Sequence, residues 1–365
     1  MKPNDELALM LRPAGGGIHV VSTGRAQQLD MQLRLYGAAT EHEVQDRFHA
    51  ALEKIPTARG VVLGIPSDVG AGFARGANFG PQAIRERLLK DGDWSAQCER
   101  LGLVDIGDVF VVPQLLSDTM LSEGQLWSSR LALYGDPAPT LPVSPLSIAE
   151  RAWDLVLAQN PKAKIFALGG DHSTALPGVK ALHKVRKGFG IVQPDAHTDL
   201  LKERLGVREC FATWSYHAND LLGRGGRLVQ VGTRASGRER HHWESTLGVR
   251  QFWAADVLAR PAAALEELLA HVKATAVSGV YFSNDIDGTD ARYADATGTP
   301  ETGGLEPDWV VELIRRLGAE VGLVGGDIME VAPLLTRHPQ SAENTLSLAA
   351  RYFRETVDAA LGSAG

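Results

Sequence analysis

The chain has little of several features that mark whole classes of proteins. Only two of its 365 residues are cysteines, Cys98 and Cys210, so we expect no disulfide framework and a reducing compartment. No apolar run approaches the ~18 residues that a membrane-spanning helix needs. The first residues, MKPNDELALMLRP, place acidic side chains before the apolar ones, which is not typical of a secretory signal. Together these features predict a soluble cytoplasmic protein that does not enter a membrane.

An excess of positive charge is missing as well. The formal net charge is -7 and the isoelectric point is about 5.9, a balance that disfavours nucleic acid or an anionic membrane as the partner. Apolar residues make up 44% of the chain, which is enough for the core of one large α/β domain or of two smaller domains.

Apolar runs and helical patterns alternate along most of the chain. Strand-like apolar runs occur at 59–66, 100–107, 163–170, 188–195, 226–233, 279–287 and 321–331. Helical patterns lie between several of them, at 147–159, 174–186, 262–273 and 307–318. Continuous apolar strands that alternate with helices are typical of a parallel sheet covered on both faces.

Two segments fall outside this alternation. Residues 1–57 show no clear strand, but 39–55 has helical apolar spacing. We therefore expect an N-terminal extension, residues 1–57, that packs on a main domain of residues 58–365. The stretch 111–146 is irregular and rich in proline, serine and leucine, and we expect a surface excursion there.

The run GFGIVQPDAHTD ends in three side chains that bind metals well. Extended backbone points every second side chain to the same face, so Asp195, His197 and Asp199 share one face. By the same rule, Asp285 and Asp287 share a face at the end of another strand-like run. Ligands in α/β folds bind at the carboxyl ends of the parallel strands, where these side chains are expected to meet.

A third strand-like run ends at His172, and a fourth leads to Glu330. Four or five carboxylates at one end of a sheet would repel one another, and a bound cation removes this repulsion. Imidazole and carboxylate ligands together suit a divalent transition metal rather than Ca²⁺. Six ligands are too many for one catalytic metal, and they suit two ions roughly 3.5–4 Å apart.

The motifs that carry these residues resemble a known family, the ureohydrolases that include arginase and agmatinase. The three segments GGDHS (169–173), DAHTD (195–199) and SNDIDGTDARYADATGTPETGGL (283–305) are similar to the three signatures of that family. The segments 64–86 and 325–335 look like its first and last blocks, so the resemblance covers about residues 59–360.

The resemblance implies a three-layer α/β/α fold with an eight-stranded parallel sheet, and a homo- or hetero-oligomer, trimeric or hexameric. It implies two metal ions, Ni²⁺ or Mn²⁺, bound by six side chains. One or both ions would be held by His172, Asp195, Asp199 and Asp285, and the second would be completed by His197 and Asp287. Which carboxylates bridge the ions stays open, since Asp195 could do so together with Asp285 or with Asp199.

The resemblance also implies a reaction, the hydrolysis of a guanidino C–N bond to a urea-type product and an amine. Asp199 would accept the proton of the attacking water and pass it to the leaving amine. Glu330 resembles the family's glutamate that holds the guanidinium, a flat cation that a carboxylate pairs with well.

The loop after DAHTD departs from the family pattern. Most ureohydrolases have a proton-shuttle histidine there, and alignment on Tyr216-His217-Ala218 sets Phe211 in its place. The loop also lacks the Ser-Gly-Asn pattern with which arginases hold an amino acid. We expect Phe211 and Trp214 to form an apolar substrate wall instead. This loop, the VGAG segment and the N-terminal extension look more like the guanidine and alkylguanidine hydrolase branch, which includes metformin hydrolase and is associated with nickel.

Three other interpretations of the sequence stay open. An agmatinase or a guanidinobutyrase would share the chemistry and differ in the substrate. A formiminoglutamate hydrolase would need a basic clamp for two carboxylates, and the loop offers only Arg204 and Arg208. A non-catalytic subunit that supports an active partner chain would explain Phe211 but not the six metal ligands.

Overall fold

The computed structural model describes residues 1–136, 140–336 and 339–362. It has one sheet with the strand order β1-β3-β2-β4-β9-β8-β5-β6-β7. Eight strands are mutually parallel, as expected, and β1 joins β3 in the antiparallel direction. The strands are β1 (Leu11–Arg12), β2 (Gly60–Ile65), β3 (Leu103–Val109), β4 (Lys164–Gly169), β5 (Gly190–Pro194), β6 (Leu228–Thr233), β7 (Arg250–Trp253), β8 (Val280–Asp285) and β9 (Leu323–Met329).

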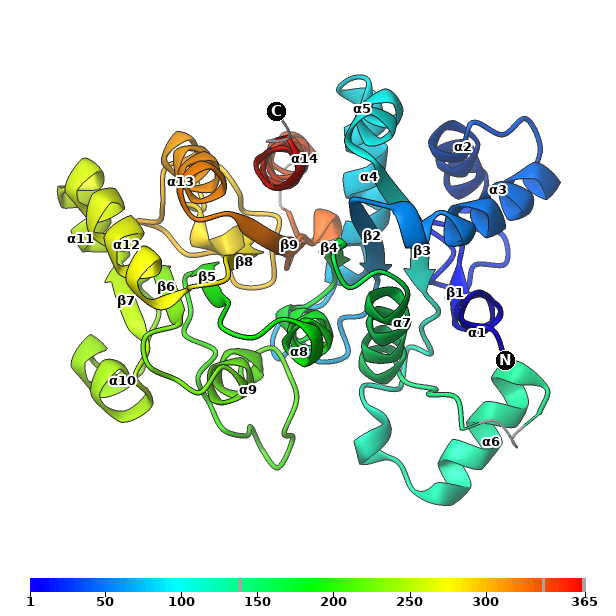
Figure 1. The fold of residues 1–365 in the computed structure, drawn as a ribbon, viewed down its shortest axis with the longest axis horizontal. Helices are drawn as coiled ribbons and strands as arrows, with labels where there is room; N and C mark the ends of the chain where they lie inside the picture. The colour runs from blue at the N-terminus through cyan, green and yellow to red at the C-terminus, as the bar shows by residue number, and fades with distance from the viewer. Residues whose placement is uncertain (137–139, 337–338, 363–365) are drawn as a thin grey trace.

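Helices cover both faces of this sheet, which makes a three-layer α/β/α fold (Figure 1). The upper layer in Figure 1 contains α4 (Gly80–Lys90), α5 (Trp94–Leu101), α11 (Ala254–Ala259), α12 (Pro261–Thr275), α13 (Pro307–Glu320) and α14 (Pro339–Leu361). The lower layer contains α7 (Pro145–Gln159), α8 (Leu176–Val185), α9 (Trp214–Leu221) and α10 (Arg240–Leu247).

The apolar side chains of the strands divide into two cores, one on each face. On β4, for example, Ile165 belongs to the core with α7 and α8, whereas Phe166 belongs to the core with α13 and α14. Every residue of β2, β5, β6, β8 and β9 is buried. Burial on both faces explains why these strands are continuous apolar runs in the sequence.

The N-terminal residues add three helices and the ninth strand at the β3 edge of the sheet. The helices are α1 (Pro3–Met10), α2 (Arg25–Tyr36) and α3 (Glu41–Glu53). The last agrees with the helical spacing at 39–55, and it begins at Thr40, whose hydroxyl accepts the Glu43 main-chain N–H. It packs against β3, and α1 packs against α7. Strand β1 has only two residues, too few for an alternating pattern.

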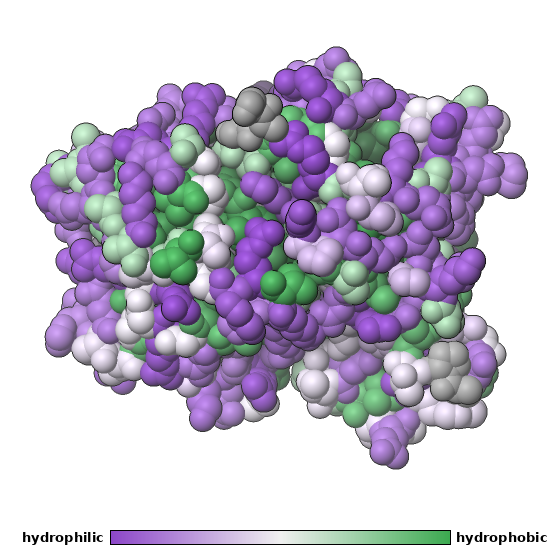
Figure 2. All heavy atoms as spheres, in the orientation of Figure 1, coloured by the Kyte–Doolittle hydropathy of each residue, from purple (hydrophilic) through white to green (hydrophobic). Residues whose placement is uncertain are grey.

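The segment 111–146 differs from the expected irregular excursion, because it contains the helix α6 (Glu123–Tyr134). This helix starts with a capping box formed by Ser122 and Gln125. None of its residues is buried, so no apolar face marks it in the sequence. It protrudes at the lower right of Figure 1, and Figure 2 shows apolar atoms on this protrusion, where Trp127 and Leu131 are exposed.

Within the described ranges, no helix is both long and apolar enough to cross a membrane.

Candidate metal centre

Four neighbouring strands bring the predicted site residues to one edge of the sheet. In the order β4-β9-β8-β5, the carboxyl ends of the parallel strands lie side by side. His172 follows β4, Glu330 follows β9 directly, Asp285 is the last residue of β8, and Asp195 follows β5 directly. The strand order therefore brings together residues that lie up to 158 positions apart in the sequence.

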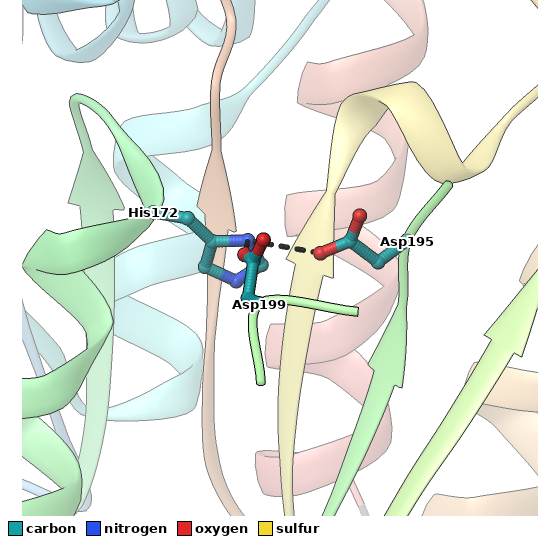
Figure 3. A group of neighbouring side chains, drawn as sticks. All are labelled: His172, Asp195 and Asp199. Atoms are coloured by element: carbon teal, nitrogen blue, oxygen red, sulfur yellow. Dashed lines mark ion pairs between the residues drawn. The ribbon is translucent and has the colours of Figure 1, made fainter. Parts of the chain in front are cut away.

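The first group of ligand atoms surrounds the Nδ1 atom of His172. This nitrogen lies 3.0 Å from Asp285 Oδ2, 3.2 Å from Asp195 Oδ2 and 3.6 Å from Asp199 Oδ2. Figure 3 shows the side chains of His172, Asp195 and Asp199 converging from separate segments. One ligand atom from each of these three residues lies within 4.8 Å of the others, so the group could hold one cation.

The second group surrounds the Nδ1 atom of His197. It lies 3.0 Å from Asp287 Oδ2 and 3.6 Å from Asp195 Oδ1, and the ligand atoms of these three residues again lie within 4.8 Å of one another. Asp195 belongs to both groups and directs one carboxylate oxygen toward each histidine. Five of the six residues predicted as ligands thus form two adjacent cation-sized groups that share Asp195, and the sixth, Asp285, lies 3.0 Å from His172 Nδ1.

The main chain around the cluster is held in an uncommon conformation. Asp199 and Glu330 have φ angles of 52° and 61°, a left-handed region that few residues other than glycine adopt. The loop after β5 is fixed by hydrogen bonds that the cluster's own carboxylates accept, from His197 N to Asp195 at 2.6 Å and from Ala196 N to Asp287 at 3.1 Å. Strain of this kind is tolerated where the surrounding structure over-determines the backbone, and it is common at active sites.

Burial and crowding of carboxylates shift the proton affinities of the cluster. Burial raises the pKa of Asp199 well above its usual range, and the neighbouring Asp195 raises it further. Burial likewise raises the pKa of Asp285, with a further contribution from Asp287. Each of these carboxylates therefore resists ionisation unless positive charge is brought close to it.

The two histidines supply part of that positive charge. Burial disfavours a charged His197, but its hydrogen bonds to Asp195 and Asp287 outweigh burial and raise its pKa to about 12. The same balance raises the pKa of His172 well above its usual range. Two imidazoles and four carboxylates at this spacing are a donor set that suits divalent transition metals, whose charge exceeds that of the protons they would displace.

Two further buried residues orient His172 and had no separate role in the sequence analysis. The Nε2 atom of His172 lies 3.1 Å from the Ser283 hydroxyl, which donates to Asp327 at 3.0 Å. This contact directs Nδ1 toward the cluster, the second-layer support that metal-binding histidines commonly receive. Ser283 could have been found from the sequence, since it lies two residues before Asp285 on the same strand and hence on the same face.

Trp214 corrects the sequence-based expectation that it forms a wall of the substrate pocket. Its side chain is fully buried because it lies under the cluster. The indole stacks on the His172 ring at 4.4 Å between centroids, and its Nε1–H donates to Asp199 Oδ2 at 3.0 Å. Trp214 therefore orients two of the proposed metal ligands and presents no face to a ligand.

Phe211, in contrast, lines a cavity of about 450 Å³, whose wall includes none of the six predicted ligands and not Glu330. The cavity lies between the loops that follow β2, β3 and β5, and most of its wall is apolar, including Val69, Leu115, Leu116 and Leu121. The Arg204 guanidinium covers the Phe211 ring at 4.9 Å. A Cβ at Gly72 would collide with both side chains, so the absence of a side chain there lets the β2 loop close over Phe211.

Glu330 lies at the edge of the cluster and is 7% exposed. Its Oε1 accepts the main-chain N–H of His172 at 2.9 Å, which leaves the second oxygen for another partner. Burial raises the pKa of Glu330 well above its usual range, and the nearby Asp171 raises it further. A cationic group bound at this edge would relieve both effects.

Comparison with known proteins agrees with this geometry. Residues 58–357 match the model of the arginase family. The guanidinobutyrase of Pseudomonas aeruginosa is 31% identical over 281 residues, which are 74% of this chain and 78% of that protein. The mitochondrial agmatinase of Gallus gallus is 31% identical over 283 residues, which are 74% of this chain and 73% of that protein.

Among solved structures, the agmatine ureohydrolase of Thermoplasma volcanium superposes with a TM-score of 0.65 and 26% identity, over 84% of this chain and 90% of that one. Arginase from Bacillus subtilis superposes with a TM-score of 0.58 at 20% identity, over 80% of this chain and 97% of that one, which shows a shared fold. The family model, the relatives and the fold all agree, and the chain belongs to the arginase family.

Proposed function

We propose that this chain is a binuclear metal-dependent amidinohydrolase that cleaves a C–N bond of a small guanidine or N-alkylated guanidine. The observation that carries the proposal is the cluster of two histidines and four aspartates, together with the neighbouring Glu330. Divalent cations held by such a cluster lower the pKa of water and stabilise the negative charge that develops on the substrate. Both Ni²⁺ and Mn²⁺ suit the donors.

The protein's own groups would perform the remaining steps. Glu330 faces the cluster edge with one unshared carboxylate oxygen and would hold the guanidinium by a charge-assisted hydrogen bond. Asp199 would take the proton of the attacking water and return it to the departing nitrogen. Its hydrogen bond from Trp214 fixes the carboxylate for this task.

The cavity supports the preference for an apolar substituent. An alkyl group gains about 0.8 kcal/mol per buried CH₂, and Phe211 with the neighbouring leucines offers the surface to bury it. Because Trp214 does not line the pocket, the apolar surface of the proposed pocket comes from Phe211 and from the loops that follow β2 and β3. Cys210 is buried and its thiol pKa is raised by burial, so it is a poor substitute for a shuttle histidine.

One observation favours a second candidate, a hydrolase of ω-guanidino acids such as guanidinobutyrate. Arg204 lines the cavity, and over residues 1–136, 140–336 and 339–362 its guanidinium makes no hydrogen bond or ion pair, only the contact with the Phe211 ring. A substrate carboxylate would pair with it, whereas the second cationic end of agmatine would be repelled. Arg208 is exposed, so the two-carboxylate clamp of a formiminoglutamate hydrolase is less well supported.

A substrate panel distinguishes these candidates. The purified chain is loaded with Ni²⁺ or Mn²⁺ and assayed with guanidine, methylated guanidines, metformin, guanidinobutyrate, agmatine and arginine. We expect turnover of the small or alkylated guanidines. Turnover of guanidinobutyrate that falls at least tenfold in Arg204→Gln would favour the second candidate, and efficient turnover of arginine would contradict both.

We further propose that the active form is an oligomer. Because Phe211 stands in the place of a shuttle histidine, the alternative is that this chain supports a catalytic partner chain. Light scattering on the same preparation gives the mass of the oligomer, and metal analysis gives the number of ions per chain. A chain that binds two metals per protomer yet turns over no guanidino compound would favour the supporting role.

A further inference from the structure

Three glutamines form a ladder across the sheet beside the metal cluster. Gln193 on β5 is the register partner of Gln230 on β6, which is the register partner of Gln251 on β7. Register partners on parallel strands point to the same face, and all three side chains are completely buried. Buried amides are costly unless each is hydrogen-bonded, so the partners of this ladder show what it does.

The direction of every hydrogen bond in the ladder follows from the carboxylate at its end. An ionised Asp195 can only accept, so Gln193 presents its Nε2 to Asp195 Oδ2, at 2.7 Å. The Oε1 of Gln193 then accepts from Gln230 Nε2 at 2.9 Å. The Oε1 of Gln230 in turn accepts from Gln251 Nε2 at 2.8 Å. Trp253 Nε1 begins the chain by donating to Gln251 at 2.9 Å. All donors are oriented toward the metal cluster.

Such an aligned chain has two consequences at the cluster. Hydrogen bonds in series polarise one another, so the last donor bears more positive charge than an isolated amide would. In addition, Gln230 Nε2 donates to the carbonyl of Thr198 at 2.6 Å. That carbonyl precedes Asp199, the residue with the left-handed backbone, so the ladder holds both a carboxylate and the loop between two proposed ligands.

The two oxygens of Asp195 are supported differently. Oδ2 lies toward His172 and accepts from Gln193, whereas Oδ1 lies toward His197 and accepts the His197 main-chain N–H. We infer that Gln193 and Gln230 are positioning residues that stabilise the cation on the His172 side more than the cation on the His197 side. This inference rests on the proposed binuclear centre. It assigns a role to two side chains, on β5 and β6, that are not among the proposed ligands.

The test is a calorimetric titration of the metal-free full-length chain with Mn²⁺, which measures the affinity of each binding event. Gln193→Met keeps the volume of the side chain and removes the donor. Loss of a support of this kind weakens metal binding by roughly 10–100-fold, and we expect that loss in one of two binding events, with the other changed by less than about threefold. Gln193→Glu, which replaces the donor by a like charge, should weaken the same event at least as much.

Two further variants separate positioning from general stability. Gln32→Met makes the same chemical change at a buried glutamine that donates to the Ala14 carbonyl, and it should leave both binding events unchanged. Gln251→Met, three hydrogen bonds along the ladder from Asp195, should weaken the same event as Gln193→Met but by a smaller factor.

The outcomes are distinguishable. Wild-type chain that binds two ions while Gln193→Met binds them equally well would overturn this inference alone. Equal weakening of both events in Gln193→Met and Gln32→Met would also overturn it, because the effect would then reflect stability. Wild-type chain that binds no metal would overturn the proposed function and this inference with it. Should Gln193→Met not fold, Gln193→Glu provides the same comparison.

Discussion

The molecule contains two clusters of buried charge that balance their negative charge in different ways. In the first, along β3, the Arg85 guanidinium donates to Asp105 at 2.8 Å and to Asp108 at 2.5 Å. The carboxylates also accept the main-chain N–H groups of Gly107 and Gly15, at 2.9 and 2.7 Å. The second cluster, at the ends of β4, β5 and β8, contains four aspartates.

Over the described residues, the ion pairs of these four aspartates are all with His172 and His197. No guanidinium or ammonium there pairs with their carboxylates, and Arg234 donates to the main-chain carbonyl of Asp287 instead. The Arg85 cluster therefore resembles a completed structural ion network, whereas the aspartate cluster has more acceptors than internal donors. The difference indicates that buried charge of the first kind stabilises the fold, and that charge of the second kind is arranged for a cation from outside the chain.

The largest expected effect comes from removing one charge of the aspartate cluster. In Asp285→Asn we expect loss of metal and a fall in activity of at least about 10³-fold, because a ligand and its charge are both lost. The metal-free variant should nevertheless be as stable as metal-free wild type or more stable, since one of the mutually repelling carboxylates is gone. Metal analysis, kinetics and thermal unfolding check the three parts. Full activity without metal would contradict the whole assignment.

The same type of change in the Arg85 cluster should have the opposite effect on stability. Arg85→Met leaves two buried carboxylates without their cation, and breaking such a pair costs about 3–5 kcal/mol of unfolding free energy. Denaturant unfolding measures this loss. Adding Asp105→Asn and Asp108→Asn to Arg85→Met should recover part of it, because the uncompensated charges are removed. If Arg85→Met unfolds at the wild-type denaturant concentration, the two clusters do not differ in the way proposed.

The two clusters differ in how well the sequence predicts them. A cluster is predictable where its residues form short patterns along the chain. The aspartate cluster was predictable because metal-binding residue types gather directly after the strand-like runs. The period of extended backbone was the wrong reason, since Asp199 has a φ of 52° and Asp287 lies in the short 3-10 helix η5 (Ile286–Gly288). The resemblance to family motifs then joined the separate strand ends. Seven of the eight parallel strands were predicted from their apolar runs, whereas β7, with four residues, gave no apolar run of its own.

The rest of the site depends on packing that no local pattern encodes. Arg85 and Asp105 are 20 positions apart, on a helix and a strand whose packing orientation is set by the tertiary fold. The glutamine ladder depends on strand register, which the sequence of one strand does not determine. Trp214 lies in the loop expected to form the pocket, yet its indole turns inward to Asp199. Apolar character alone does not distinguish a pocket wall from a support under the cluster.

Metal binding to the aspartate cluster should depend on pH, and the sign follows from His197. Its pKa is raised to about 12 in the folded chain, above the usual ~6.5. Its protonated form thus stabilises the metal-free fold fully below ~6.5, and that contribution is lost as pH rises through about 12. A metal needs the neutral imidazole, so binding near pH 7 should release a proton and the affinity should rise about tenfold per pH unit for each proton released.

Calorimetry in two buffers with different ionisation enthalpies at the same pH counts the released protons. The Arg85 cluster, whose carboxylates already pair with a guanidinium, provides the contrast, since Asp108→Asn should leave this proton count unchanged. A metal affinity that does not change between pH 6.5 and 8 would contradict the proposed exchange of protons for metal.

Glu330→Gln should affect the substrate and spare the metal. Glu330 keeps its contact with the His172 main-chain N–H through the amide oxygen, so the cluster geometry is retained. A hydrogen bond between charged groups contributes roughly 1.5–3 kcal/mol, and we therefore expect kcat/KM to fall at least tenfold with two metals still bound. Unchanged kinetics would show that the carboxylate does not face the guanidinium.

The smallest expected effect concerns the hydroxyl of Thr299, which donates to Asp287 Oδ2 at 3.1 Å. That oxygen also lies 3.0 Å from His197, so Thr299→Val removes a donor from the His197 side of the cluster with little change in volume. A single hydrogen bond contributes about 0.5–1.5 kcal/mol, which corresponds to a roughly 2–10-fold weaker cation on that side. Thr299→Ser retains the hydroxyl and should restore the affinity. Gln193, in contrast, donates to the oxygen of Asp195 that lies toward His172. Thr299→Val and Gln193→Met should therefore weaken different binding events. Titration of the double variant with Mn²⁺ should then show both losses, each close to its value in the single variant, because the two side chains contact different carboxylates. Loss of the same event in both single variants would mean that the cluster responds as one unit and that its two halves are not supported separately.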